Sequence, residues 1–109
     1  MAGNWKMHKT IQETIEFFDQ FTPLVVNITR CDIVVFPAII NIQAAVDAAV
    51  GSSILIGGQN ISWAEEGAYT GEISGDMLRA AGATWVMIGH SERRKYFHEC
   101  DADILRKLG

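Results

Sequence analysis

The chain has 109 residues, of which 49% are hydrophobic and 20% charged, as expected of a globular α/β protein rather than a disordered or fibrous one. Its formal net charge of −4 argues against nucleic acid and anionic membranes as partners, because both require a basic surface. No apolar run approaches the roughly 20 residues that span a bilayer, and no targeting segment is evident, so we expect a cytoplasmic protein.

The first part of the chain predicts two strands separated by a helix. An extended segment ends at Lys6, and the capping-box pattern of Thr10–Glu13 then starts a helix. The buried face of this helix is predicted from residues at helical spacing, namely Ile11, Ile15 and Phe18. Residues 32–36 form a short apolar run bounded by polar residues and proline, which is typical of a buried strand.

The middle of the chain continues the alternation of helix and strand. Residues 42–49 have the spacing of an amphipathic helix, with Gly51 as its stop, and residues 53–57 predict another buried strand. A third helix is expected from Ser74 to Gly82. Its predicted buried side chains are Met77, Leu78 and Ala81.

The last predicted strand is residues 85–88, which are all apolar and read as buried on both faces. A final helix is expected from near Asp101. Its predicted buried side chains are Ile104, Leu105 and Leu108. Four strands alternating with helices predict a parallel sheet with right-handed crossovers, and no linker divides residues 1–109 into separate domains.

Polar residues that suit chemistry lie at two strand ends. Side chains alternate along an extended segment, so Asn4 and Lys6 are expected on one face, where an amide and an ammonium suit an anionic, oxygen-rich ligand. His90 follows the strand at 85–88, and ligands of parallel sheets collect at such carboxyl ends. The free N–H groups of a following helical turn would disfavour an imidazolium there, although His90 also fits a plain turn or cap residue.

The cysteines and the third histidine give no sign of a metal site. Cys31 and Cys100 lack metal-ligand spacing, and we expect them to be reduced packing residues. His98, Glu99 and Cys100 do not fall on one helical face. The sequence therefore predicts no bound metal.

Four motifs, in their order and spacing, closely resemble the triose-phosphate isomerase family over essentially all 109 residues. They are Gly3-Asn4-Trp5-Lys6-Met7, Gly58-Gln59-Asn60, Gly67-Ala68-Tyr69-Thr70-Gly71-Glu72 and Ile88-Gly89-His90-Ser91-Glu92-Arg93-Arg94. The resemblance implies the TIM (β/α)8-barrel fold. Because such a barrel takes about 250 residues, the chain resembles an N-terminal half-barrel with four parallel strands.

The resemblance also implies the activity and the roles of the site residues. The family interconverts glyceraldehyde 3-phosphate and dihydroxyacetone phosphate through an enediolate, without a cofactor. By resemblance His90, Lys6 and Glu92 are catalytic, and Asn4 and Lys6 bind the substrate. From the residues alone, Glu92 fits equally well as a first-turn carboxylate or a partner of Arg93.

The family's glutamate base and its phosphate loops lie in the other half of the barrel. A general base contributes about 10² to 10⁴-fold, so we expect the isolated chain to be inactive or very weak and to bind triose phosphate weakly. The alternative is a non-catalytic half-barrel that self-associates or complements a second half.

Association is expected in either case. By resemblance Thr70 and Glu72 belong to a loop that enters a neighbouring subunit, although the loop's glycines also fit a simple turn. Open strand edges at Asn4 and Val86 would favour a homo-oligomer.

Overall fold

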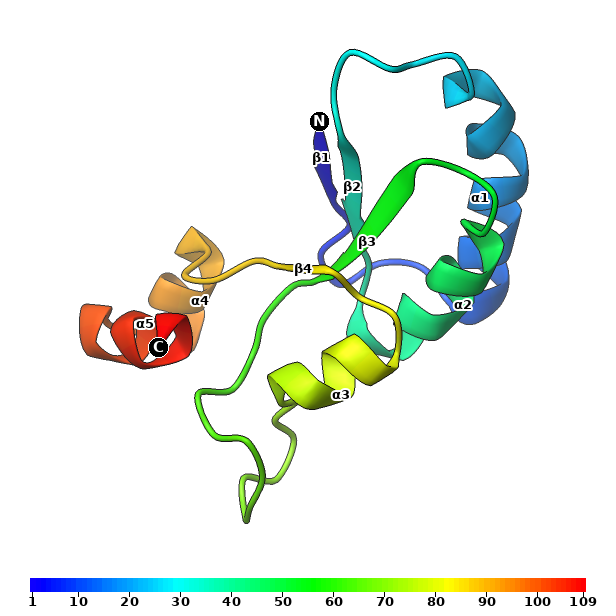
Figure 1. Cartoon of the computed structure of the whole chain (residues 1–109). Helices are drawn as coiled ribbons and strands as arrows, with labels where there is room; N and C mark the ends of the chain where they lie inside the picture. Colours follow the sequence, from blue (N-terminus) through cyan, green and yellow to red (C-terminus); the bar gives the residue numbers. More distant parts are fainter.

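The computed structural model describes residues 1–109, in which strands and helices alternate (Figure 1). The elements in chain order are β1 (Ala2–Asn4), α1 (Ile11–Val25), β2 (Ile33–Phe36), the 3-10 turn η1 (Ile39–Asn41), α2 (Ile42–Ala48), β3 (Ile54–Gly58), α3 (Gly75–Ala80), β4 (Trp85–Val86), α4 (Ser91–Tyr96) and α5 (Asp101–Leu108). None of these helices is long and apolar enough to span a bilayer.

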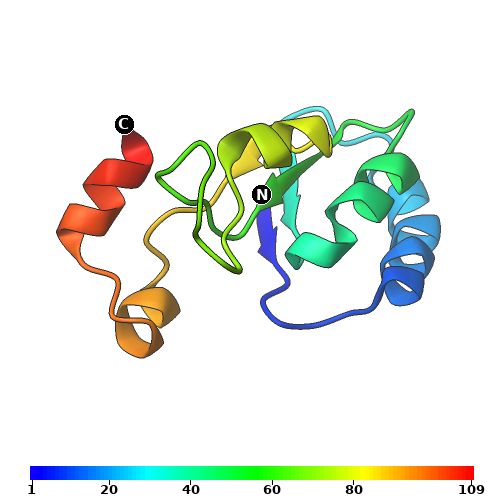
Figure 2. The same ribbon diagram turned by 90° about the horizontal axis from the view of Figure 1, so that it is seen from below.

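The four strands form one parallel sheet in the order β1-β2-β3-β4, which confirms the predicted α/β architecture. All four residues of β2 are buried, as expected of an apolar central strand. Helices α1 and α2 pack together on one side of the sheet, whereas α4 and α5 lie far from them, beyond β4 (Figures 1 and 2). The core lies between the sheet and helices α1 and α2, and Leu78 of α3 also belongs to it.

The strand predicted at 85–88 is shorter and more exposed than expected. Only Trp85 and Val86 pair with a neighbour, and Trp85 keeps 48% of its surface exposed. The prediction of burial on both faces was wrong, since Trp85 is exposed and Val86, Met87 and Ile88 are only half-buried. β4 pairs only with β3 and forms an edge of the sheet. β1 forms the other edge, so both predicted edges are confirmed.

Helix α1 starts as predicted and buries Phe18 as predicted, but Ile11 and Ile15 do not share its buried face. The capping box is present, with the Thr10 hydroxyl accepting from the Glu13 N–H. The buried residues are Thr14, Phe18 and Val25, while Ile11 and Ile15 are 51% and 37% exposed. A cluster of aromatic rings accounts for the rotation of the helix about its axis, and its members are Trp5, Phe17, Phe18 and Phe21.

The later helices agree with the predictions in position but not always in burial. Ile42 and Ala45 of α2 are buried as predicted, and α3 begins directly after Ser74, close to its predicted start, with the Ser74 hydroxyl as its cap. Leu78 is buried, but Met77 is 56% exposed because it lies on the solvent side of α3.

Helix α5 has no buried apolar face, contrary to the prediction. Leu105 and Leu108 are 69% and 67% exposed, whereas Ile104 is half-buried and lies against Gly89. Lys107 of α5 makes hydrogen bonds to Asn60 and Glu99, and Arg106 lies over the ring of Trp63, so α5 is held largely by its charged side chains. Both cysteines are exposed as well, so they are not packing residues.

Candidate active site

A pocket of about 270 Å³ lies at the carboxyl ends of the strands, where a parallel sheet collects its ligands. It is lined by Asn4, Lys6, Met7, Gln59, Asn60, Met87, His90, Glu92, Arg93 and Phe97. All four residues predicted to bind or transform a ligand, Asn4, Lys6, His90 and Glu92, therefore meet in one place.

Lys6 adopts a backbone conformation that residues other than glycine rarely adopt. Its φ of 55° lies in the left-handed region, so the extended segment ends at Asn4 rather than at Lys6. Asn4 and Lys6 share the pocket as predicted, but through a turn in which the Lys6 N–H donates to Asn4 Oδ1 at 2.9 Å, and not through strand alternation. Strained backbone of this kind persists only where neighbouring groups hold it.

Gln59 is one of those neighbouring groups, and the sequence prediction gave it no role. Its side-chain Nε2 donates to the carbonyl oxygens of Lys6 and Phe36, both at 2.8 Å. It thereby joins the ends of β1 and β2 from its place directly after β3. In the sequence, Gln59 was marked only as part of the Gly58-Gln59-Asn60 motif, directly after a predicted buried strand.

Lys6 and Glu92 form an ion pair across the pocket, with Nζ and Oε1 separated by 2.7 Å. The two side chains are 50% and 44% exposed. The hydrogen bond from Lys6 holds the pKa of the Glu92 carboxyl below its ordinary value. Glu92 is therefore ionised at neutral pH and faces the ammonium that is predicted to hold an anion.

His90 is both the cap of α4 and a group that faces the pocket. Its Nδ1 accepts the backbone N–H of Glu92 at 3.1 Å, which makes His90 the N-cap residue. A nitrogen that accepts a hydrogen bond carries no proton, so in this arrangement the ring proton is on Nε2. That N–H is the one available to donate to a ligand oxygen.

The pocket supplies hydrogen-bond donors and one carboxylate, which is already paired with Lys6. Lys6 offers an ammonium, Asn4 an amide and His90 an N–H, whereas Glu92 is the only carboxylate in the lining. Such a set can bind an anion and stabilise charge that develops on an oxygen. It contains no free base that could remove a proton from carbon.

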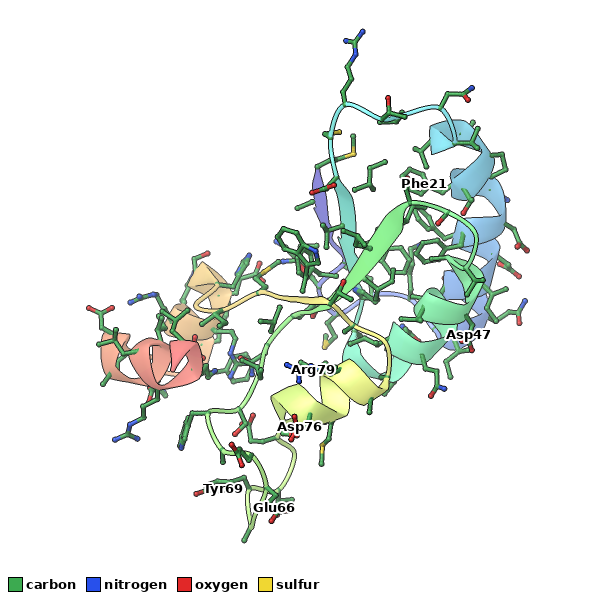
Figure 3. The ribbon with its side chains drawn as sticks, in the orientation of Figure 1. Phe21, Asp47, Glu66, Tyr69, Asp76 and Arg79 are labelled. Carbon is green, nitrogen blue, oxygen red and sulfur yellow. The ribbon has the colours of Figure 1, made fainter.

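Thr70 and Glu72 lie outside this pocket. Thr70 is exposed in the loop between β3 and α3, and Figure 3 shows the labelled Tyr69 and Glu66 of the same loop projecting away from the sheet. Glu72 lines a neighbouring pocket of about 260 Å³, which it shares with Lys6. No group of three or more His, Cys, Asp or Glu side chains is placed to hold a metal ion.

Comparison with known proteins gives one consistent family. The family model described as triosephosphate isomerase matches residues 1–109. The triosephosphate isomerase of Solibacter usitatus is 57% identical over 107 residues, which are 98% of this chain and 43% of that protein. The one from Moorella thermoacetica is 50% identical over 108 residues, with 99% and 43% covered.

A solved structure agrees with the sequence matches. The crystal structure of triosephosphate isomerase from Bartonella henselae superposes with a TM-score of 0.90 at 37% identity, covering 99% of this chain and 44% of that one. The chain thus spans less than half the length of the relatives that it matches.

Proposed function

Since the chain belongs to the triosephosphate isomerase family and forms the N-terminal part of its barrel, we propose that it carries one part of the active site that interconverts glyceraldehyde 3-phosphate and dihydroxyacetone phosphate. The observation that carries this proposal is the convergence of Lys6, His90 and Glu92 on one pocket. Asn4 completes the set by holding the turn at Lys6.

Each side chain has a role that its geometry supports. The Lys6 ammonium attracts the substrate phosphate and offsets negative charge on the enediolate. The His90 Nε2–H donates to the substrate oxygen on which that charge develops. A neutral histidine paired with a glutamate base is the mechanism described for this family. Glu92 keeps Lys6 oriented through their 2.7 Å contact.

Proton abstraction requires a group that this chain does not place in the pocket. The Glu92 carboxylate already accepts a hydrogen bond from Lys6, so the base comes from a segment that completes the barrel. A general base contributes about 10² to 10⁴-fold, and the chain by itself is therefore at most a weak isomerase. A purely associative role is not favoured, because association would not require Lys6, His90 and Glu92 to meet in one pocket.

The same proposal includes self-association in the cytoplasm. The edges at β1 and β4 have no partner strand on their outer sides, and such edges favour pairing with another chain. The exposed loop that carries Thr70 and Glu72 is a second surface for contact with another copy. Sedimentation at micromolar concentration should give a species larger than 12.0 kDa, and a cooperatively melting monomer would contradict this part.

The catalytic assignment is tested by an isomerase assay on the chain combined with a polypeptide that supplies the rest of the barrel. His90→Gln should reduce the rate by about 10² to 10³-fold, because it removes a donor to the developing oxyanion. Cys31→Ser is the matched control, since Cys31 is exposed and lies outside the pocket. An unchanged rate for His90→Gln would refute the assignment.

A further inference from the structure

A buried ion pair lies beside the pocket and has no part in the chemistry described above. Glu99 is the only ionisable residue among the buried ones, and the side chains of Glu99 and Lys107 are each 4% exposed. Lys107 Nζ donates to Glu99 Oε2 at 2.5 Å and to Asn60 Oδ1 at 2.7 Å. Arg93 Nε donates to the same Glu99 oxygen at 3.0 Å.

These four side chains join separate elements of the chain. Lys107 belongs to α5, Glu99 to the turn before α5, Arg93 to α4, and Asn60 to the segment directly after β3. Asn60 and Arg93 also line the active-site pocket. Asn60 follows Gln59, whose side chain donates a hydrogen bond to the Lys6 carbonyl. Arg93 follows Glu92, whose carboxylate accepts a hydrogen bond from the Lys6 ammonium.

Apolar packing does not fix the position of α4. No side chain of this helix is buried, and Tyr96 and Phe97 are 62% and 65% exposed. The ion pair between Lys6 and Glu92 is about half exposed, and such pairs are screened and weak. The desolvated contacts of Glu99 with Arg93 and Lys107 are therefore the firmest polar link between α4 and the end of β3.

The pair is also poorly suited to stability alone. Glu99 Oε1 is buried without a hydrogen-bond partner, and an unsatisfied buried oxygen of this kind costs free energy. Buried ion pairs are often no more stabilising than apolar side chains of the same volume, and in some proteins they select one geometry instead. The placement of this pair fits that second role.

We propose that Lys107 and Glu99 are positioning residues that fix α4 against the end of β3, so that Glu92 meets Lys6 and His90 faces the pocket. The geometric part of this proposal stands by itself. Its catalytic consequence rests on the proposed isomerase function.

The first test reads the contact between Glu92 and Lys6 directly, by NMR titration of the Glu92 carboxyl in the 109-residue chain. Lys6→Ala gives the pKa of Glu92 without its partner. Lys107→Met should raise the pKa of Glu92 to that reference, because α4 is no longer held. The double variant Glu99→Gln/Lys107→Met should do the same without leaving a buried charge unpaired.

The chain offers a matched control. Arg94 and Asp101 also join α4 to the start of α5 by an ion pair, at 2.8 Å, but their side chains are 46% and 84% exposed. Arg94→Met should leave the pKa of Glu92 where it is in the unaltered chain.

Two results would overturn the proposal. One is a double variant that melts cooperatively and keeps the low pKa of Glu92. The other is failure of both Lys107 variants to melt cooperatively, since the pair would then be a determinant of folding rather than of position.

The second test uses the isomerase assay with the rest of the barrel supplied. Lys107→Met should lower kcat by up to about 10²-fold, the cost of misplacing a catalytic group by about 1 Å, and Arg94→Met should not lower it. Loss of kcat together with the pKa change supports the proposal, whereas full kcat in the Lys107 variants overturns its catalytic part. If the unaltered mixture is inactive, the isomerase function fails and the titration still decides the positioning role.

Discussion

Replacing Lys6 with alanine should separate activity from stability. The ammonium makes one side-chain hydrogen bond, to Glu92, and half of its surface is exposed, so solvent already screens the contact that is lost. The melting temperature should change by less than about 4 °C in a chain of this size. Isomerase activity should nevertheless fall by about 10² to 10³-fold, because Lys6 is the pocket's donor to both phosphate and enediolate.

The assay pairs thermal unfolding of the chain with the isomerase rate measured when the rest of the barrel is supplied. Arg94→Ala is the control, since Arg94 makes a similar exposed ion pair outside the pocket. It should change neither quantity appreciably. Full activity in the Lys6→Ala protein would refute the placement of Lys6 in the site, and a large loss of stability would mean that its role is structural.

Three further results are expected. Phe18→Ala should cost about 3–5 kcal/mol of unfolding free energy because Phe18 is 1% exposed, whereas Ile11→Ala should cost less than about 1 kcal/mol, and equal costs in urea unfolding would contradict the observed face of α1. Burial alone would raise the pKa of Glu99, but hydrogen bonds from Lys107 and Arg93 bring it below its ordinary value. The folded state thus favours the ionised form of Glu99. Its contribution to the free energy of unfolding is therefore present above the unfolded pKa of about 4.3 and is lost as pH falls through the lower folded pKa. In acid unfolding, the unaltered chain should therefore lose stability between these two pKa values, and the Glu99→Gln variant should not. Identical profiles of stability against pH for the two proteins would contradict this prediction. Phosphate should bind the isolated chain weakly and less tightly as salt rises, and micromolar, salt-independent binding in calorimetry would contradict the open pocket described above.

The sequence predicted those features that depend on local patterns. The capping box at Thr10, the start of α3 at Ser74 and the apolar runs of β2 and β3 are local, and all lie where they were expected. The buried face of α1 depends on aromatic rings that meet only in the folded chain, so helical spacing alone chose Ile11 wrongly.

In the site too, local patterns predicted some features and long-range contacts decided the others. His90 and Asn4 were placed from strand ends and family motifs, and the structure brings them to one pocket with Lys6. The hydrogen bond from Gln59 to the Lys6 carbonyl spans 53 positions in sequence, and that from Lys107 to Asn60 spans 47. Contacts over such separations leave no periodic pattern. The motif Gly58-Gln59-Asn60 was visible in the sequence, but the hydrogen bonds that its two amides make could be recognised only in the structure.

The most direct test of the central claim compares the isomerase rate of the unaltered chain alone with its rate after addition of a polypeptide that supplies the rest of the barrel, including the base. If the chain carries the electrophile and phosphate-binding part of the site, the chain alone should show little or no activity and the mixture a much higher rate. A mixture that folds and associates but remains as inactive as the chain alone would contradict the claim.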